Sequence, residues 1–136
     1  MNRRSVLLAA PALLVTAAAH ADDRTFYTPG LAESAMAAGQ VVILDFWASW
    51  CSTCAAQERV IAALMDATPA YRAAITVIVV DWDAYAEGDL SRALKIPRRS
   101  TLVALKGNQE IGHIVAGTGR AEIKALFDAA LAAAKG

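Results

Sequence analysis

The sequence predicts an α/β fold, a three-layer sandwich whose mixed sheet has a parallel centre and a C-terminal antiparallel hairpin. Two continuous apolar runs, residues 41–47 and 75–80, have the length and composition of strands covered on both faces. Segments with helical spacing of apolar residues alternate with these runs, as in βαβ units. Two later apolar segments flank a short polar turn, which indicates the hairpin.

The first half of the domain follows from local signals. The elements expected there are an edge strand over residues 25–28, a helix over 29–38 closed by Gly39, a central strand over 41–47 and a long helix over 52–67. The long helix has apolar residues at helical spacing, and Pro69 breaks this pattern.

The second half ends in the hairpin and a helix. The elements expected are a buried strand over residues 75–80, a short helix over 88–95, hairpin strands over 101–105 and 110–115, and a final helix over 119–134. Glu122 is suitably placed in the first turn of that helix, next to the positive end of its dipole. Asp81 and Asp83 are interpreted as surface and turn residues, and His113 as a surface residue of an edge strand.

Cys51 and Cys54, the only cysteines, lie where the central strand gives way to the long helix. Residues one helical turn apart share a face, so their Cα atoms fall within the range of about 4.4 to 6.8 Å that a disulfide tolerates. Unpaired amide N–H groups and the helix dipole at this helix start favour thiolate over thiol. We therefore predict that Cys51 is a solvent-exposed nucleophile and Cys54 the resolving thiol. A structural staple is the alternative, but a bridge closing so short a loop stabilises little.

Residues 1–21 are predicted to be a signal peptide. A basic start with Arg3 and Arg4 precedes an apolar stretch over residues 6–19, and Ala19-His20-Ala21 has small residues where a signal peptidase reads them. We expect cleavage after Ala21, export to the periplasm by a route that stays open, and a mature domain over residues 22–136. The apolar stretch is short for a bilayer span, so a retained membrane anchor is the weaker alternative.

Charge and composition exclude several other functions. The whole chain carries 13 basic and 13 acidic residues, and removing Arg3 and Arg4 with the leader leaves 11 basic residues. This balance argues against nucleic acid as a partner, because such binders usually carry a basic patch. Haem attachment would need a histidine where Ala55 stands, and a zinc site would be incomplete with only His113 beside the two cysteines. We expect no metal and no bound cofactor.

Residues 44–54, Leu-Asp-Phe-Trp-Ala-Ser-Trp-Cys-Ser-Thr-Cys, resemble the active-site motif of the thioredoxin family, Asp-Phe-Trp-Ala-x-Trp-Cys-x-x-Cys. Residues 100–107 are similar to the family's hairpin, and Gly117 before the final helix agrees. The resemblance runs through most of residues 25–134 and implies a thioredoxin-like fold and thiol–disulfide oxidoreductase activity. By the same resemblance, Trp50 would flank the nucleophile and Asp45 would sit partly buried beneath the resolving cysteine.

The residues themselves agree with a catalytic role for Asp45. A carboxylate at the end of an apolar strand is costly to ionise, so its pKa should rise. Such a group is suited to accept the proton of Cys54 when that thiol must become nucleophilic. The alternative is an aspartate that caps the active-site loop through backbone amides. Trp50 is expected to touch substrate because it adjoins Cys51.

The segment before the hairpin departs from the family pattern twice. Ser100 stands where relatives carry a cis proline, so we expect a trans bond between Arg99 and Ser100. We expect this loop still to face the nucleophile, with Arg99, Ser100, Thr101 and Gly117 contributing to substrate binding. Arg98 and Arg99 place two positive charges nearby, which would favour thiolate; a solvated loop is an equal alternative.

Thiol–disulfide exchange is therefore the predicted reaction: Cys51 attacks a substrate disulfide, and Cys54 resolves the mixed disulfide. We expect a monomer without stable membrane insertion that reduces the disulfides of protein substrates. The resemblance also implies a membrane electron-transfer reductase that recharges the pair. Two alternatives stay open, a disulfide-forming oxidant and a non-catalytic peptide-binding module in a thioredoxin-like shell.

Overall fold

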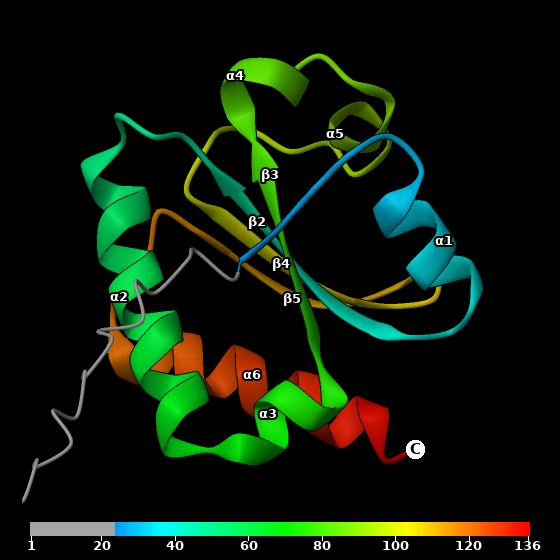
Figure 1. The fold of residues 1–136 in the computed structure, drawn as a ribbon, viewed down its shortest axis with the longest axis vertical. Coiled ribbons are helices and arrows are strands. Elements are labelled where there is room, and N and C mark those ends of the chain that lie inside the picture. The colour runs from blue at the N-terminus through cyan, green and yellow to red at the C-terminus, as the bar shows by residue number, and fades with distance from the viewer. Residues whose placement is uncertain (1–23) are drawn as a thin grey trace, which may run out of the picture.

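The computed structural model describes residues 24–136, so the predicted leader and its cleavage site after Ala21 lie outside the described residues. The elements in chain order are β1 (Thr25–Phe26), α1 (Leu31–Ala37), β2 (Val41–Trp47), α2 (Ser52–Ala67), α3 (Pro69–Ala74), β3 (Thr76–Asp81), α4 (Trp82–Tyr85), α5 (Asp89–Ala93), β4 (Thr101–Lys106), β5 (Gln109–Val115) and α6 (Arg120–Ala134). Figure 1 shows this arrangement.

The sheet has the predicted mixed topology. Its strand order is β1-β3-β2-β4-β5, with β2 in the middle. β3 pairs in parallel with both β1 and β2. β4 pairs antiparallel with β2 and with β5, so the C-terminal hairpin is confirmed. β2 has the predicted bounds, and its first six residues are buried, as expected for a strand covered on both faces.

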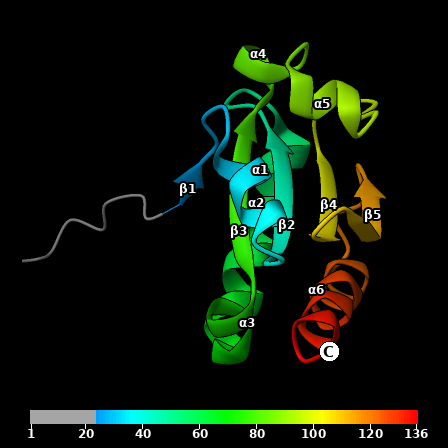
Figure 2. The same ribbon diagram turned by 90° about the vertical axis from the view of Figure 1, so that its right-hand side faces the viewer.

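Two hydrophobic cores make the sandwich. Strand alternation sends Val41 and Ile43 of β2 to the core that contains residues of α2, α3 and α6. Val42, Leu44 and Phe46 point the other way, into the core that contains residues of α1 and α5. Figure 1 shows α2, α3 and α6 on one side of the sheet and α1 on the other, and Figure 2 shows α4 and α5 at the opposite end of the molecule from α3.

Two short helices were not expected from the sequence. Pro69 ends the pattern of α2 as predicted, but it also occupies the first position of α3, where its missing N–H costs nothing. α3 is held by Tyr71, which is buried and packs edge-on against Phe127 of α6 with ring centroids 5.3 Å apart. α4 stands where a turn was expected, because the Asp81 side chain accepts a hydrogen bond from Asp83 N at 3.0 Å and caps the helix.

The two edge strands of the described sheet lie where the sequence predicts them. β5 is an edge strand, and His113 lies on it with an exposed side chain, whose Nδ1 is 3.4 Å from Glu110 Oε1. β1 is shorter than expected and forms the other edge. Within residues 24–136, none of the helices has the length and apolar character needed to cross a membrane.

Candidate active site

Cys51 caps the N-terminus of α2. The chain leaves β2 through a turn, and Cys51 adopts an extended backbone conformation from which its Sγ accepts a hydrogen bond from Cys54 N at 3.2 Å. Both cysteines are free thiols in this structure. The predicted solvent exposure of the nucleophile is wrong in degree: Cys51 is only 5% exposed and Cys54 is fully buried. The reason is packing, because Ala48, Trp47 and Trp82 close around the pair.

The two thiols differ in acidity. Burial raises the pKa of Cys51, but hydrogen bonds from the Cys54 thiol, the Ser100 hydroxyl and the Cys54 amide outweigh it and lower that pKa to about 7. Burial dominates at Cys54 and raises its pKa, and the hydrogen bond with Cys51 adds to this rise. At neutral pH the pair therefore holds its negative charge on Cys51.

Ser100 lies against both sulfurs. Its Oγ is 3.1 Å from Cys51 Sγ and 3.1 Å from Cys54 Sγ, and the side chain is fully buried. The loop that carries it thus faces the cysteine pair. No peptide bond within residues 24–136 is cis, so the bond between Arg99 and Ser100 is trans.

Trp50 and Arg99 form the rim of the site. Trp50 is 59% exposed, and the Arg99 guanidinium lies over its ring at 4.4 Å from the centroid. The Trp50 indole donates to both carboxylate oxygens of Asp83, at 2.9 and 3.0 Å. Arg99 also helps to lower the pKa of Cys51, which favours the thiolate-stabilising interpretation over a solvated loop. Arg98 donates instead to the Arg99 carbonyl at 3.1 Å.

Asp45 lies on the α2 side of the sheet. It alternates with Leu44 and Phe46, so its carboxyl group faces the core beneath α2, where it is 3% exposed. Burial, helped by the negative charge of Glu58 and opposed by the positive charge of Arg24, raises its pKa to about 7. Its Oδ1 makes no hydrogen bond, which disfavours the alternative of a loop cap through that atom.

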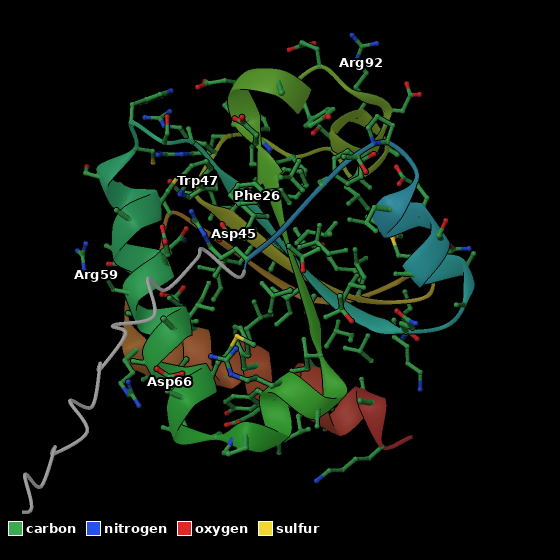
Figure 3. All side chains as sticks on the ribbon, in the orientation of Figure 1. Phe26, Asp45, Trp47, Arg59, Asp66 and Arg92 are labelled. Atoms are coloured by element: carbon green, nitrogen blue, oxygen red, sulfur yellow. The ribbon has the colours of Figure 1, made fainter. Side chains whose placement is uncertain are left out.

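A cavity of about 480 Å³ adjoins Asp45 and is also lined by Arg24 and Glu58. Arg24 forms an ion pair with Glu58 at 3.1 Å, and its guanidinium stacks on the rings of Phe26 and Trp47 at 5.0 and 4.9 Å. Figure 3 shows Asp45 near Phe26 and Trp47, beside α2. Besides Cys51, the charged groups that act on the pKa of Asp45 thus come from the residue before β1 and from the second turn of α2.

Thr101 and Gly117 help to shape the backbone around the site. The Thr101 side chain is 1% exposed and donates to the Arg98 carbonyl at 2.7 Å, so it shapes the loop and offers no side-chain surface to a substrate. The expectation that Thr101 contributes to substrate binding stays a prediction. At Gly117 a Cβ would meet the Glu122 carboxylate, so glycine leaves room for this side chain at the start of α6. The Gly117 carbonyl accepts a hydrogen bond from Gln57 Nε2 at 2.9 Å.

Gln57 and Asp83 are site residues that the sequence analysis missed. Gln57 is fully buried in α2 and donates from Nε2 to the Ser100 carbonyl as well as to Gly117. A polar residue on the apolar face of the predicted helix was the available signal, because a buried amide needs partners. Asp83 had no such signal, since Trp50 lies 33 positions away in the sequence.

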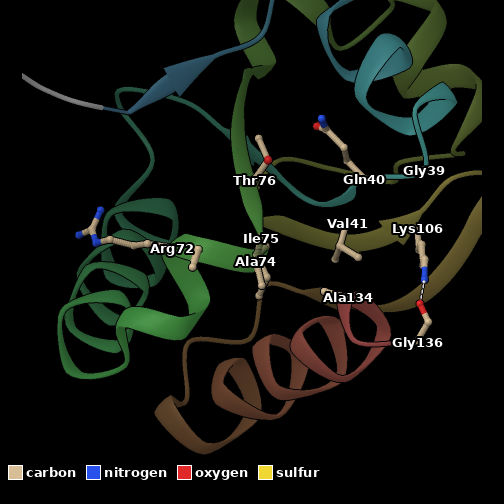
Figure 4. A pocket seen from close by; sticks show the side chains of 11 residues that line it. Gly39, Gln40, Val41, Arg72, Ala74, Ile75, Thr76, Lys106, Ala134 and Gly136 are labelled. Atoms are coloured by element: carbon tan, nitrogen blue, oxygen red, sulfur yellow. Dashed lines mark hydrogen bonds between the residues drawn. The ribbon is translucent and has the colours of Figure 1, made fainter.

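A second depression lies at the opposite end of β2. This cavity, also of about 480 Å³, is lined by residues that include Gln40, Val41, Arg72 and Lys106 (Figure 4). Its cations already have partners: Arg72 pairs with Asp66 at 2.9 Å, and Lys106 donates to the carbonyls of Ala133 and Gly136 at 2.9 Å each. Among residues 24–136, no three histidine, cysteine, aspartate or glutamate side chains gather as metal ligands would.

Comparison with known proteins agrees with this geometry. The family model for thioredoxin matches residues 28–129. Thioredoxins of Coprinus comatus and Echinococcus granulosus are 29% and 28% identical over 94 and 97 residues, which cover 69% and 71% of this chain and 84% of each relative. A bifunctional thioredoxin reductase/thioredoxin of Mycobacterium leprae is 27% identical over 88 residues, covering 65% of this chain but only 18% of that protein.

Solved structures show the same fold. The thioredoxin Mala s 13 of Malassezia sympodialis superposes with a TM-score of 0.68 at 24% identity, covering 79% of this chain and 92% of that one. Trxlp of Edwardsiella tarda superposes with a TM-score of 0.65 at 27% identity, covering 74% and 94%. A mixed sheet with a cysteine pair at the start of a helix defines a class of redox proteins, and this chain belongs to the thioredoxin family. With Cys51 and Cys54 in place, it is a thioredoxin-like thiol–disulfide oxidoreductase that acts on protein thiols and disulfides.

Proposed function

We propose that this protein is an exported reductant of protein disulfides, with Cys51 as nucleophile, Cys54 as resolving thiol and Asp45 as proton acceptor. The observation that supports electron flow from the cysteine pair to the substrate is the acidity of Cys51, whose pKa is lowered to about 7. In this class of proteins, such a value of about 7 accompanies a reducing site, while a strongly oxidising member has a pKa of about 3.5.

The reaction has two exchange steps. The Cys51 thiolate attacks one sulfur of a substrate disulfide, which forms a mixed disulfide and expels the other substrate sulfur as thiolate. Cys54 then gives up its proton to Asp45 and attacks Cys51 Sγ, which releases the second substrate sulfur. The substrate gains two electrons and two protons overall, and the enzyme pair becomes a disulfide.

The acidity of Asp45 suits its role in the second step. Its pKa of about 7 makes it half ionised near neutral pH, so it can both take up and release a proton there. Trp50, which is exposed next to Cys51, and Arg99, which lies over its ring, are proposed to contact the substrate peptide.

The location and the electron donor are also part of the proposal. The basic start, the apolar stretch and the small residues before Asp22 support export to the periplasm with cleavage after Ala21. A protein that leaves the cytosol as a reductant needs a source of electrons across the membrane, so we propose a membrane electron-transfer reductase as its partner. The bifunctional relative, whose name couples thioredoxin with thioredoxin reductase, supports a dedicated reductase of some kind.

The reduction potential tests the direction. Equilibration with glutathione is expected to give a value near about −270 mV, as for a reducing thioredoxin, whereas a value near about −120 mV would make the protein an oxidant. A Cys54→Ser variant should trap substrates as mixed disulfides on Cys51, and a Cys51→Ser variant is the matched control that should trap none. Equal trapping by the two variants would contradict the assignment of Cys51 as nucleophile.

A further inference from the structure

The Ser100 hydroxyl stands midway between the two reactive sulfurs. Its Oγ is 3.1 Å from each Sγ, while Cys51 and Cys54 themselves are nearly or fully buried. A hydroxyl has one hydrogen to donate and lone pairs with which to accept. It can therefore donate to whichever of the two sulfurs is charged.

The backbone fixes Ser100 in this position. Its φ of 62° lies in the left-handed region, which is costly for a residue with a side chain. Ser100 N donates to the Phe46 carbonyl at 2.7 Å, and its own carbonyl accepts from Ala116 N at 2.8 Å and from Gln57 Nε2 at 3.0 Å. With all of its backbone groups bonded, only the hydroxyl hydrogen of Ser100 needs to turn for the donor to change its partner.

Buried Cys54 has the greater need for such a donor. Cys54 is fully buried, so water does not reach its sulfur to stabilise a charge. Ser100 is one of the groups that lower its pKa against the larger effect of burial. Once Cys51 has bonded to a substrate sulfur, it carries no charge and no longer needs the Ser100 hydrogen bond.

We propose that Ser100 is a catalytic residue of the exchange reaction, whose hydroxyl hydrogen bonds first to the Cys51 thiolate and then to the Cys54 thiolate. This inference rests on the proposed function of the cysteine pair. In the first step, Ser100 donates to Cys51 as that sulfur attacks. In the second step, Asp45 takes the Cys54 proton, Ser100 donates to the new thiolate, and the bond between Cys51 and the substrate sulfur breaks as the enzyme disulfide forms.

Stopped-flow kinetics with 5,5′-dithiobis(2-nitrobenzoate) separates the two steps. Reduced protein mixed with this small disulfide should release one coloured thiolate when Cys51 attacks, at a rate that depends on concentration. It should release a second when Cys54 resolves the mixed disulfide, at a rate that does not. For Ser100→Ala we expect both rates near neutral pH to fall by about tenfold, the effect of one hydrogen bond to a charged sulfur.

Two further variants separate the hydroxyl from the backbone. Ser100→Gly suits a positive φ and also lacks the hydroxyl, so it should be as slow as Ser100→Ala. Ser91→Ala is the matched control, because it removes another buried hydroxyl, one that donates to the Tyr85 carbonyl at 2.7 Å. Its two rates should equal those of the wild type.

The results distinguish this inference from the proposed function. Ser100→Ala rates within twofold of the wild type would overturn the role of Ser100 and leave the cysteine chemistry intact. A slow Ser100→Ala variant beside a Ser100→Gly variant with normal rates would also overturn it, because the hydroxyl would then be dispensable. Failure of the wild-type protein to release either thiolate would overturn the proposed function, and the role of Ser100 with it.

Discussion

At the scale of single residues, the two cysteines lie one helical turn apart but differ in acidity. Cys51 receives hydrogen bonds from the Cys54 thiol and amide and from Ser100, so its pKa falls, while burial leaves the pKa of Cys54 raised. This difference assigns the order of the two chemical steps. The resolving thiol needs a base, and Asp45 is the buried carboxyl group available on the same side of the sheet.

Replacing Asp45 with asparagine tests its role as that base. In the wild-type protein, the rate of mixed-disulfide resolution should rise with pH through about 7, because Asp45 must be ionised to accept a proton. In Asp45→Asn we expect a resolution rate lower by about 10- to 100-fold near neutral pH, with the rise displaced to higher pH. The measurement is the second phase of thiolate release against pH. Asp66→Asn, at an exposed position, is the control, and an unchanged profile in Asp45→Asn would remove the proton-acceptor role.

The Asp83 carboxylate is expected to hold Trp50 in place for substrate. Asp83→Ala removes both hydrogen bonds to the Trp50 indole, which should let this exposed ring move. We expect KM for a protein disulfide to rise by about threefold with little change in kcat, since a binding contact is weakened and the sulfurs are untouched. Asp89→Ala, at another exposed aspartate, should leave KM unchanged. A KM in Asp83→Ala equal to that of the wild type would remove Trp50 positioning as its role.

Residues whose partners are close in the chain were predictable from the sequence. The cysteine pair, its place at a helix start and the burial of Asp45 follow from spacing and apolar pattern over residues 41–54. Contacts across the fold were harder to predict: Gln57 meets Ser100 across 43 positions, and Asp83 meets Trp50 across 33. The helical pattern indicates that Gln57 is buried, but no pattern in the sequence identifies the partner of Gln57 or of Asp83, because each contact depends on how a loop is folded onto the end of the sheet.

At the scale of elements, the site depends on where β2 ends and α2 begins. Alternation along β2 directs Asp45 toward α2, and the N-terminus of α2 supplies the amide that bonds Cys51. α2 also brings Glu58 to the cavity beside Asp45, where it pairs with Arg24. The charge on one helix therefore affects the acidity of a strand residue.

Removal of the Glu58 charge should move the titration of Asp45. The negative charge of Glu58 raises the pKa of Asp45, so Glu58→Gln should lower it. We expect the rise of the resolution rate with pH to shift to lower pH in this variant. Glu87→Gln is the control, because Glu87 is exposed and pairs with Arg92 on another element. A shift to higher pH, or none, would contradict the electrostatic link between α2 and Asp45.

Long elements were predictable and short ones were not. β2 and α2 have enough residues for a run or a period to define them, and both have the predicted bounds. α3 and α4, with 6 and 4 residues, are too short for a period. They form because Tyr71 is buried against α6 and because the Asp81 side chain caps α4, and both causes require the folded chain.

At the scale of the whole molecule, the fold tolerates a buried carboxyl group. In the folded chain burial raises the pKa of Asp45 from 3.8 to about 7. Below about 4 the group is protonated in both the folded and the unfolded chain, so it has no effect on stability there. As the pH rises to about 7, only the unfolded chain ionises freely, so the free energy of unfolding falls. The loss is on the order of 4 kcal/mol and is complete above about pH 7.

Urea unfolding of the oxidised protein measures this loss. Asparagine at position 45 does not ionise, so Asp45→Asn should gain stability relative to the wild type between pH 4 and pH 8. The oxidised form is used because its two sulfurs do not titrate. Parallel stability profiles for the two proteins over this range would show that Asp45 has an ordinary pKa, which would contradict both its burial and its proposed role.

Alkylation of the reduced protein by iodoacetamide as a function of pH, with the modified residue identified by mass spectrometry, tests directly whether Cys51 is the nucleophilic thiolate. We expect Cys51 to react first, with a rate that rises through a pKa of about 7, while Cys54 stays unmodified. Modification of Cys54 before Cys51, or a Cys51 that stays inert at neutral pH, would contradict this role of Cys51.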